Sequence, residues 1–125
     1  MNVPKNLNFT KNHEWVKIEG QEALIGITDY AQSELGEIVF IELPALGDSR
    51  EKETTFGTVE AVKAVSDLFM PVTGTVIAVN ADLENKPELV NEDPYETGWM
   101  IRISITDPSE LSSLLDAEAY SLFIK

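Results

Sequence analysis

The sequence contains no cysteine and only one histidine, His13. Without cysteine the chain can form no disulfide, no cysteine-ligated metal site and no thiol nucleophile. One histidine leaves little for general acid–base catalysis, and no second histidine stands at the spacing of an HExxH zinc site. We therefore expect no catalytic residues and no metal site, and any redox or group-transfer chemistry would need an added group.

Positive charge is also scarce, since 9 Lys and Arg face 22 Asp and Glu and the net charge is −13. This balance opposes binding to nucleic acid or to an anionic membrane and favours basic protein partners. No apolar run reaches 18 residues, so we expect no membrane span. The N-terminus lacks the pattern of a signal or transit peptide, which predicts a cytoplasmic protein, or a mitochondrial matrix protein only if this is a processed form. The length predicts one domain over 1–125.

The pattern of apolar residues is mostly that of strands. It predicts strands over 13–18, 22–27, 37–43, 55–62, 70–80 (after a turn) and 99–105, a short helix over 28–36 and a loop over 80–98. A C-terminal helix is predicted to open over 107–116, with Glu110 completing a capping-box-like pattern, and 117–125 would extend or repeat it. We expect the core to lie on strands 37–43, 74–79 and 99–105.

Two short segments echo each other. GTVEAV (57–62) and GTVIAV (74–79) match at five of six positions. The match predicts a sheet built from two related halves with a hairpin between them. The alternative is chance similarity between two valine-rich strands, which draw on a limited set of residues.

Lys63 stands out in the stretch VEAVKAVSD (59–67). In a regular strand it would share a face with Val59 and Val65, and burying an unpaired ammonium is costly. A lysine is usually just a solvated surface residue. Here, however, it has small apolar neighbours, lies between two similar strands and belongs to a chain with no other chemistry. A lysine amine can form an amide with a carried acid, which would make a long arm and raise the carried group's effective concentration at a partner.

Four further residues remain open to two readings each. Ser66 and Asp67 are typical of a turn, or could contact such an arm or be recognised by an attaching enzyme. Glu60 fits a solvated strand residue better than a recognition residue. Glu14, beside a tryptophan, could face a cleft, whereas His13 is better explained as structural. The acidic excess is either a solvated face or a docking surface.

Three segments together resemble the glycine cleavage system H protein family. They are VEAVKAVSDLFMPVTGTV (59–76), which resembles the family's lipoyl-attachment segment, residues 13–48, and VNEDPYETGWMIRI (90–103). Departures are small: Phe69-Met70 stands where a Tyr-Ala or similar pair is common, and Thr97 interrupts a usually Gly-containing loop. Neither departure touches Lys63.

The resemblance implies a mainly β fold, a barrel-sandwich hybrid of two antiparallel sheets with a short internal helix and a C-terminal helix. It implies lipoate covalently attached to Lys63 at a hairpin tip. It also implies that the loaded arm folds into a surface cleft, where Glu14 and Asp67 match positions beside it and Ser66 is a further candidate contact.

The family's role implies a non-catalytic shuttle. Such a carrier takes the aminomethyl group from a pyridoxal-phosphate glycine decarboxylase to a tetrahydrofolate-dependent aminomethyltransferase. Its arm is then reoxidised by dihydrolipoamide dehydrogenase, which uses FAD and NAD. A lipoate-attaching enzyme is the fourth expected partner, and we expect a monomer.

Other carrier readings fit less well. Lipoyl domains of 2-oxoacid dehydrogenases usually have an acidic residue before the lysine and lie in longer chains with linkers, whereas Val62 stands here. Biotin carriers usually flank the lysine with methionines, whereas Val62 and Ala64 flank it here. A lipoyl donor or relay for other proteins, or a binding module that never carries the cofactor, remains an alternative.

Overall fold

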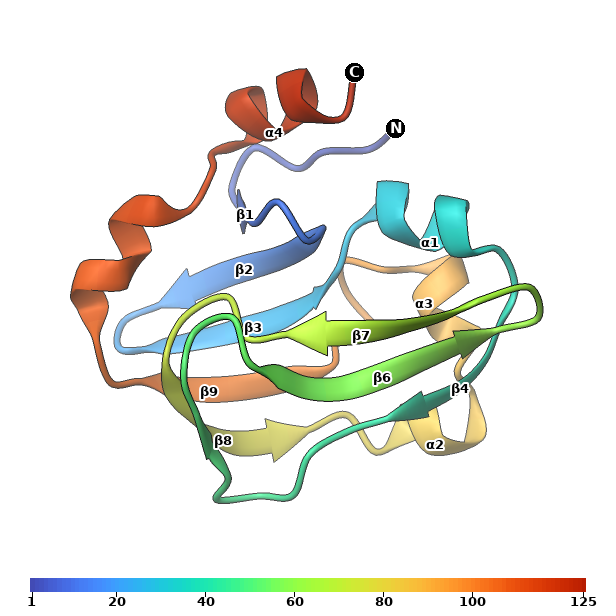
Figure 1. Cartoon of the computed structure of the whole chain (residues 1–125), viewed down its shortest axis with the longest axis horizontal. Helices are drawn as coiled ribbons and strands as arrows, with labels where there is room; N and C mark the ends of the chain where they lie inside the picture. Colours follow the sequence, from blue (N-terminus) through green and yellow to red (C-terminus); the bar gives the residue numbers. More distant parts are fainter.

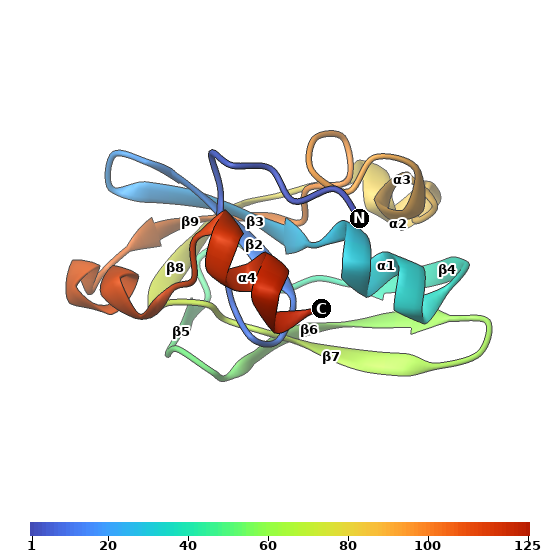
Figure 2. The same ribbon diagram turned by 90° about the horizontal axis from the view of Figure 1, so that it is seen from above.

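The computed structural model describes residues 1–125 as two antiparallel sheets that pack face to face. One sheet has six strands in the order β1-β2-β3-β9-β8-β5, and the other has three in the order β4-β6-β7. Figure 2 shows the layers from above, with β6 and β7 below β2, β3 and β9. The predicted mainly β fold with two antiparallel sheets is confirmed, and the sheets do not close into a barrel.

Short helices interrupt the series of strands along the chain, as Figure 1 shows. The strands are β1 (Asn8–Phe9), β2 (Glu14–Glu19), β3 (Glu22–Ile27), β4 (Ile38–Glu42), β5 (Ser49–Arg50), β6 (Thr55–Ala61), β7 (Val65–Phe69), β8 (Gly74–Val79) and β9 (Ile101–Ile105). The helices are α1 (Asp29–Leu35), α2 (Asp82–Asn85), α3 (Leu89–Glu92), the 3₁₀ helix η1 (Pro108–Ser113) and α4 (Ala117–Phe123). No helix is long and apolar enough to cross a membrane.

The main core fills the space between the two sheets. Alternate residues of β9 point into it, so that Ile101, Ile103 and Ile105 are buried while Arg102 and Ser104 are only partly covered. Val59 of β6 and Val76 of β8 enter the same cluster from opposite sheets. A smaller cluster around Phe9, Trp15 and Tyr120 attaches α4 to the six-stranded sheet.

Helix α1 begins and ends where the sequence predicts. The Thr28 hydroxyl accepts a hydrogen bond from the Ala31 N–H at 3.1 Å and caps the first turn. Gly36 ends the helix with φ +80°, a left-handed conformation that glycine adopts without a steric penalty. The helix is thereby held between β3 and β4, which places it beside the β6–β7 hairpin (Figure 1).

The predicted loop over 80–98 is partly wrong, because the segment contains the one-turn helices α2 and α3. Each helix buries one apolar residue, Leu83 or Val90, in the main core. Helices of one turn have no amphipathic period long enough to stand out in a polar segment, and they are stabilised by packing instead.

The helix predicted to open over 107–116 is confirmed at its start but differs in type and length. The segment forms the short 3₁₀ helix η1, and Asp107 caps it by accepting from the Ser109 N–H at 3.2 Å. Glu110 makes no capping box, because its carboxylate accepts from the Thr73 N–H at 2.6 Å and hydroxyl at 3.0 Å. The chain then extends, bonds to Phe9 through Leu115, and starts α4 as a separate helix.

The sequence echo does not form one sheet. GTVEAV forms most of β6 and GTVIAV forms β8, and these strands belong to different sheets. The two segments nevertheless share one structural requirement. A Cβ on Gly57 would collide with the Glu42 carbonyl, and a Cβ on Gly74 would collide with the Ser104 carbonyl. Both glycines therefore let a neighbouring backbone approach closely.

Candidate functional site

Lys63 lies in the turn that joins β6 to β7. The Ala61 N–H donates to the Ala64 carbonyl at 2.7 Å and closes the turn, and the Val62 N–H donates to the Glu37 carbonyl at 2.9 Å. β6 ends at Ala61, so the alternation that would bury Lys63 beside Val59 stops before it. The side chain is exposed, as expected for a lysine at a hairpin tip.

The stem of Lys63 passes over the end of α1. A Cβ at Gly36 would lie 3.3 Å from Lys63 Cε and 3.8 Å from Nζ. The absent side chain at Gly36 thus gives the lysine room to lie across the helix end. The carbonyl end of a helix carries partial negative charge, so this position is favourable for an ammonium group.

A cleft of about 270 Å³ lies between α1, β7 and the turn that precedes β2, and Val59 and Ser66 are its lining residues nearest in sequence to the Lys63 turn. Three residues predicted from the sequence as arm contacts, Glu14, Ser66 and Asp67, line it together. Its other lining residues are Asn12, His13, Ile27, Tyr30, Ala31, Glu34, Leu35, Val59 and Leu68. Each residue of a strand advances the chain by about 3.3 Å. Val65 at the start of β7 and Phe69, whose N–H bonds to Glu14, therefore lie about 13 Å apart along the strand.

Glu14 forms the buried acidic end of the cleft and is only 1% exposed. Its carboxylate accepts a hydrogen bond from the Thr10 hydroxyl at 2.6 Å and a longer one from the Phe69 N–H at 3.4 Å. Burial raises the pKa of Glu14 to about 7, the two hydrogen bonds oppose this rise, and Glu53 adds to it. Near neutral pH this carboxyl group is therefore divided between its neutral and ionised forms.

Ser66 and Asp67 lie on strand β7 and not in a turn, so the turn reading of this pair is wrong. Ser66 is opposite Val59 and Asp67 is opposite Thr58 on β6. Both side chains are exposed. Neighbouring strand residues point to opposite faces, so Ser66 lies on the inner face with Val59, while Asp67 lies in the outer row with Thr58 and Glu42. β7 is the edge of its sheet, and Asp67 therefore stands at the rim of the cleft.

One wall of the cleft escaped the sequence reasoning. Helix α1 contributes Tyr30, Ala31, Glu34 and Leu35, two pairs with i, i+4 spacing that lie on one helix face. The i, i+4 spacing is visible in the sequence, but no sequence pattern predicts that this helix face contacts β7. His13 was expected to be structural, and it both lines the cleft and bonds to α4.

His13 joins the cleft to the C-terminal helix. Its Nδ1 lies 2.8 Å from the Tyr120 hydroxyl, which in turn lies 2.8 Å from the Thr28 hydroxyl. Burial lowers the pKa of His13, and the nearby Glu34 opposes this effect. The backbone of His13 has φ +69°, an uncommon conformation for a residue other than glycine.

The cleft suits a flexible apolar chain that ends in a cation. The walls formed by Ile27, Leu35 and Leu68 offer hydrocarbon surface, while Glu14 and Asp67 offer carboxylates. No group of three or more His, Asp or Glu is arranged to hold a metal ion. The residues present therefore fit a lipoyl group attached at Lys63.

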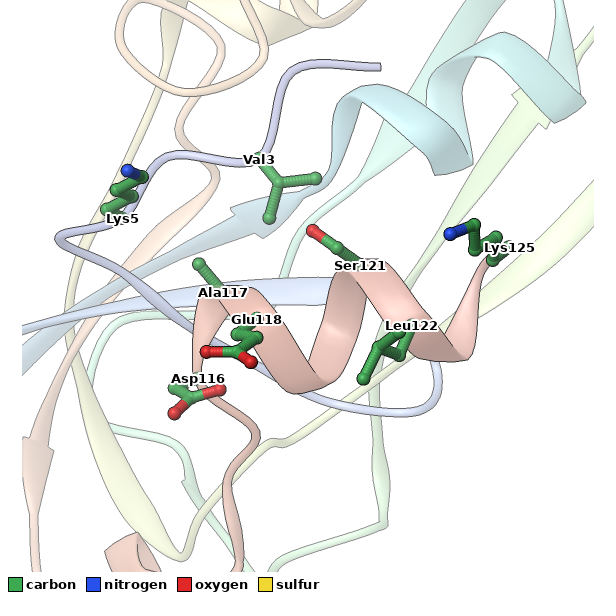
Figure 3. Close-up of a pocket in the computed structure, with 8 residues that line it drawn as sticks. All are labelled: Val3, Lys5, Asp116, Ala117, Glu118, Ser121, Leu122 and Lys125. Atoms are coloured by element: carbon green, nitrogen blue, oxygen red, sulfur yellow. The ribbon is translucent and has the colours of Figure 1, made fainter.

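A larger hollow of about 740 Å³ lies elsewhere, between the N-terminal segment and α4 (Figure 3). Its lining residues include Val3 and Lys5 of the N-terminal segment and Ala117, Ser121 and Leu122 of α4. It contains none of the residues predicted from the sequence, and charges of both signs line it.

Comparisons with known proteins agree with this geometry. Residues 7–125 match the family described as glycine cleavage H-protein. The chain is 52% identical over 125 residues to a glycine cleavage system H protein from Brevibacillus brevis, covering 100% of this chain and 99% of that protein. It also superposes on the crystal structure of a glycine cleavage system H protein from Mycobacterium marinum with a TM-score of 0.87 and 34% identity, over 95% of this chain and 96% of that one. The chain belongs to the glycine cleavage H-protein family.

Proposed function

We propose that this chain, as a single lipoyl-carrier domain over 1–125, is the lipoyl-bearing shuttle of the glycine cleavage system, with lipoate joined to Nζ of Lys63 by an amide. The observation that carries the proposal is that Lys63 lies on an exposed turn and that strand β7, which follows this turn, lines a cleft that ends in a buried carboxyl group. When bound, the lipoyl disulfide supplies the redox and group-carrying chemistry that the chain lacks.

The chain's own residues present and shelter the arm. The β6–β7 turn holds Lys63 away from the core, because its closing hydrogen bond and its bond to Glu37 fix the backbone. Gly36 leaves space for the lysine stem at the end of α1. From there the cleft runs along β7, so an arm attached at Lys63 can lie in it without any change in the sheets.

Glu14 and Asp67 are suited to a cationic amine carried at the end of the arm. An exposed ion pair contributes only about 0–1 kcal/mol, but the buried Glu14 is better shielded from water. A cation in the cleft would favour the ionised form of Glu14 and bring its raised pKa down. An arm without a positive charge gains no such interaction, so the cleft distinguishes a loaded arm from an empty one.

The partners follow from this role. We propose that the chain meets glycine decarboxylase, aminomethyltransferase, dihydrolipoamide dehydrogenase and a lipoate-attaching enzyme, and that it does so as a monomer. Its acidic charge favours basic docking surfaces on them. The family match supports this role over a lipoyl donor or a domain of a 2-oxoacid dehydrogenase.

Intact mass after expression with lipoate tests the proposal. Peptide mapping should place the whole added mass on the fragment that contains Lys63, and the net charge should become one unit more negative than −13. Lys63→Arg keeps the charge but has no acylable amine, so it should stay unmodified, while Lys86→Arg should be modified normally. Lipoylation of the Lys63→Arg protein would overturn the assignment.

A further inference from the structure

Four apolar side chains stand in water around the Lys63 turn. Val62 and Val65 are 72% and 66% exposed, and Val39 and Phe40 of β4 are 48% and 46% exposed. We call these four residues the tip patch. Single exposed apolar residues are common, but several gathered at one end of a sheet indicate a surface that another molecule covers.

The strand register shows that the tip patch is one surface. Phe40 is opposite Glu60, and Glu60 is opposite Val65, so these three side chains form a row on the outer face of the three-stranded sheet. Val62 lies two residues beyond Glu60, and its N–H is bonded to Glu37 at the start of β4. The patch therefore continues from β4 across to both sides of the Lys63 turn.

A bulge in β4 makes the patch larger than a regular strand would. The register slips between Ile38 and Phe40, so that Val39 is the extra residue. In an unbroken strand Val39 and Phe40 would point to opposite faces. Here both are exposed, while Ile38 and Ile41 on either side are buried. Bulges commonly re-aim side chains at functional edges.

Apart from Lys63, the charged side chains around the patch are acidic. Glu37, Glu60 and Glu42 lie on or beside the outer face of β4 and β6, and Lys63 is the only cation in β4, β6, β7 and the turn between β6 and β7. Acylation removes that cation. A surface complementary to this one is apolar where it meets the four side chains and carries Lys or Arg opposite Glu60, in the middle of the row, and at its rim.

We propose that the tip patch is the docking surface of the enzyme that attaches lipoate to Lys63, an inference that rests on the proposed function. The deprotonated Nζ attacks the carbonyl carbon of an activated lipoyl donor such as an acyl adenylate. The N–C bond forms, the bond to the leaving group breaks with its electron pair, and the amine proton is released. Water must be kept from the activated donor, so the enzyme has to enclose the turn.

The short reach of lysine singles out this partner. Its side chain carries Nζ only about 6 Å from Cα, because each bond is about 1.5 Å long. An enzyme acting on Nζ must therefore cover the residues next to Lys63. Partners that act on the far end of a lipoyl arm react up to an arm's length from Nζ, so their chemistry does not require them to cover the tip patch.

The test compares two double variants. Val39→Ser with Phe40→Ser removes half of the patch, and Leu46→Ser with Ile77→Ser removes apolar side chains that are 65% and 41% exposed before β5 and on β8. Each apo protein is given to a purified lipoate-attaching enzyme with its donor, and acylation of Lys63 is followed by intact mass. We expect kcat/KM of the patch variant to fall at least ~10-fold through KM, as for truncated anchor residues, with less than ~2-fold change in the control. Val62→Ser, in the turn itself, should fall in the same direction.

A second readout separates this partner from the others. Each variant is acylated to completion, and its lipoyl group is then reduced by dihydrolipoamide dehydrogenase and NADH at a rate we expect to equal wild type. Equal acylation of patch and control variants overturns the inference, and so does an equal loss in the reduction step. If the wild-type protein gains no lipoyl mass at Lys63, the proposed function itself fails and the inference falls with it.

Discussion

The Nδ1 atom of His13 lies 2.8 Å from the hydroxyl oxygen of Tyr120, a residue 107 positions later in the chain. The same hydroxyl meets Thr28 at 2.8 Å, and Thr28 caps α1. One phenol group on α4 thus connects the two walls of the cleft, the turn at His13 and the start of α1. The far end of the chain thereby fixes the shape of the site.

Replacing Tyr120 by Phe removes this connection and keeps the ring. The ring stacks on Phe9 with centroids 4.7 Å apart, and Phe can retain that contact. We expect the free energy of unfolding to fall by about 1–3 kcal/mol, because the buried Thr28 hydroxyl loses a partner. Chemical denaturation measures the loss. Tyr30→Phe removes only an exposed 3.4 Å bond to Glu34, so an equal loss there would contradict the argument.

Glu14 gives the stability a pH dependence of unusual sign for a carboxylate. Its pKa is about 7 in the folded protein and 4.5 as the reference value. Between these values the folded protein holds a proton that the unfolded chain has released, so the free energy of unfolding decreases as pH rises through this window. The full effect is reached above pH 7 and amounts to at most about 3 kcal/mol.

Glu14→Gln should remove that slope. The difference in unfolding free energy between the variant and wild type should shift in favour of the variant from about pH 4.5 to 7 and then stay constant. Urea denaturation at a series of pH values measures it. Glu19→Gln, at an exposed position, provides the control. A constant difference across this range would show that Glu14 ionises normally in the folded state.

The loaded carrier should lose its cargo faster without the cleft carboxylates. Glu14→Gln and Asp67→Asn remove charges at the buried end and the rim of the cleft that can pair with the cargo amine, whereas Glu19→Gln removes an exposed charge outside the cleft. We expect faster spontaneous release of ammonia and formaldehyde from the first two, measured without any transferase. Release at the rate of the Glu19→Gln protein would mean that these carboxylates do not guard the arm.

The fold should not depend on lipoylation. Lys63 is exposed, and the core cluster between the sheets contains no residue of its turn. We therefore expect the unmodified and lipoylated proteins to melt cooperatively with closely similar midpoints in calorimetry. An unmodified protein without a cooperative transition would refute this independence.

The core of β8 offers a sharp contrast between neighbours. Val76 is 1% exposed and packs between the sheets, while Ile77 is 41% exposed on the outer face. Val76→Asp buries an unpaired carboxylate and should lower the free energy of unfolding by several kcal/mol, on the order of 3 or more. Ile77→Asp should change it by less than about 1 kcal/mol. If the two variants lost similar amounts of unfolding free energy in thermal denaturation, Val76 would not be the buried residue of the pair.

The sequence predicts the structure of a segment correctly where that structure depends mainly on the segment's own residues. The strands predicted over 13–18 and 22–27 and the helix predicted over 28–36 depend on neighbouring residues, and the structure confirms them as β2, β3 and α1. The capping-box pattern predicted at Glu110 does not form, because Thr73, which is distant in sequence, donates a hydrogen bond to its carboxylate. A capping box is a local pattern, and a better partner brought by the tertiary fold overrides it.

The candidate site, too, could be predicted from the sequence only in part. The presentation of Lys63 followed from chemistry that the sequence displays, since a charge among apolar neighbours cannot be buried cheaply. The burial of Glu14 did not, because it depends on Thr10, on Phe69 and on α1 closing over one end of β2. Long-range packing therefore sets the pKa of the residue, and no local pattern reveals it.

The residues that follow the two matching segments, GTVEAV and GTVIAV, differ from each other. Lys63 follows GTVEAV, and Asn80 follows GTVIAV. Asn80 is buried and donates to the carbonyls of Thr97 and Trp99 at 2.9 and 2.7 Å. The two positions therefore have opposite roles. Asn80 is an internal anchor that ties down the 97–99 segment, whereas Lys63 projects into solvent.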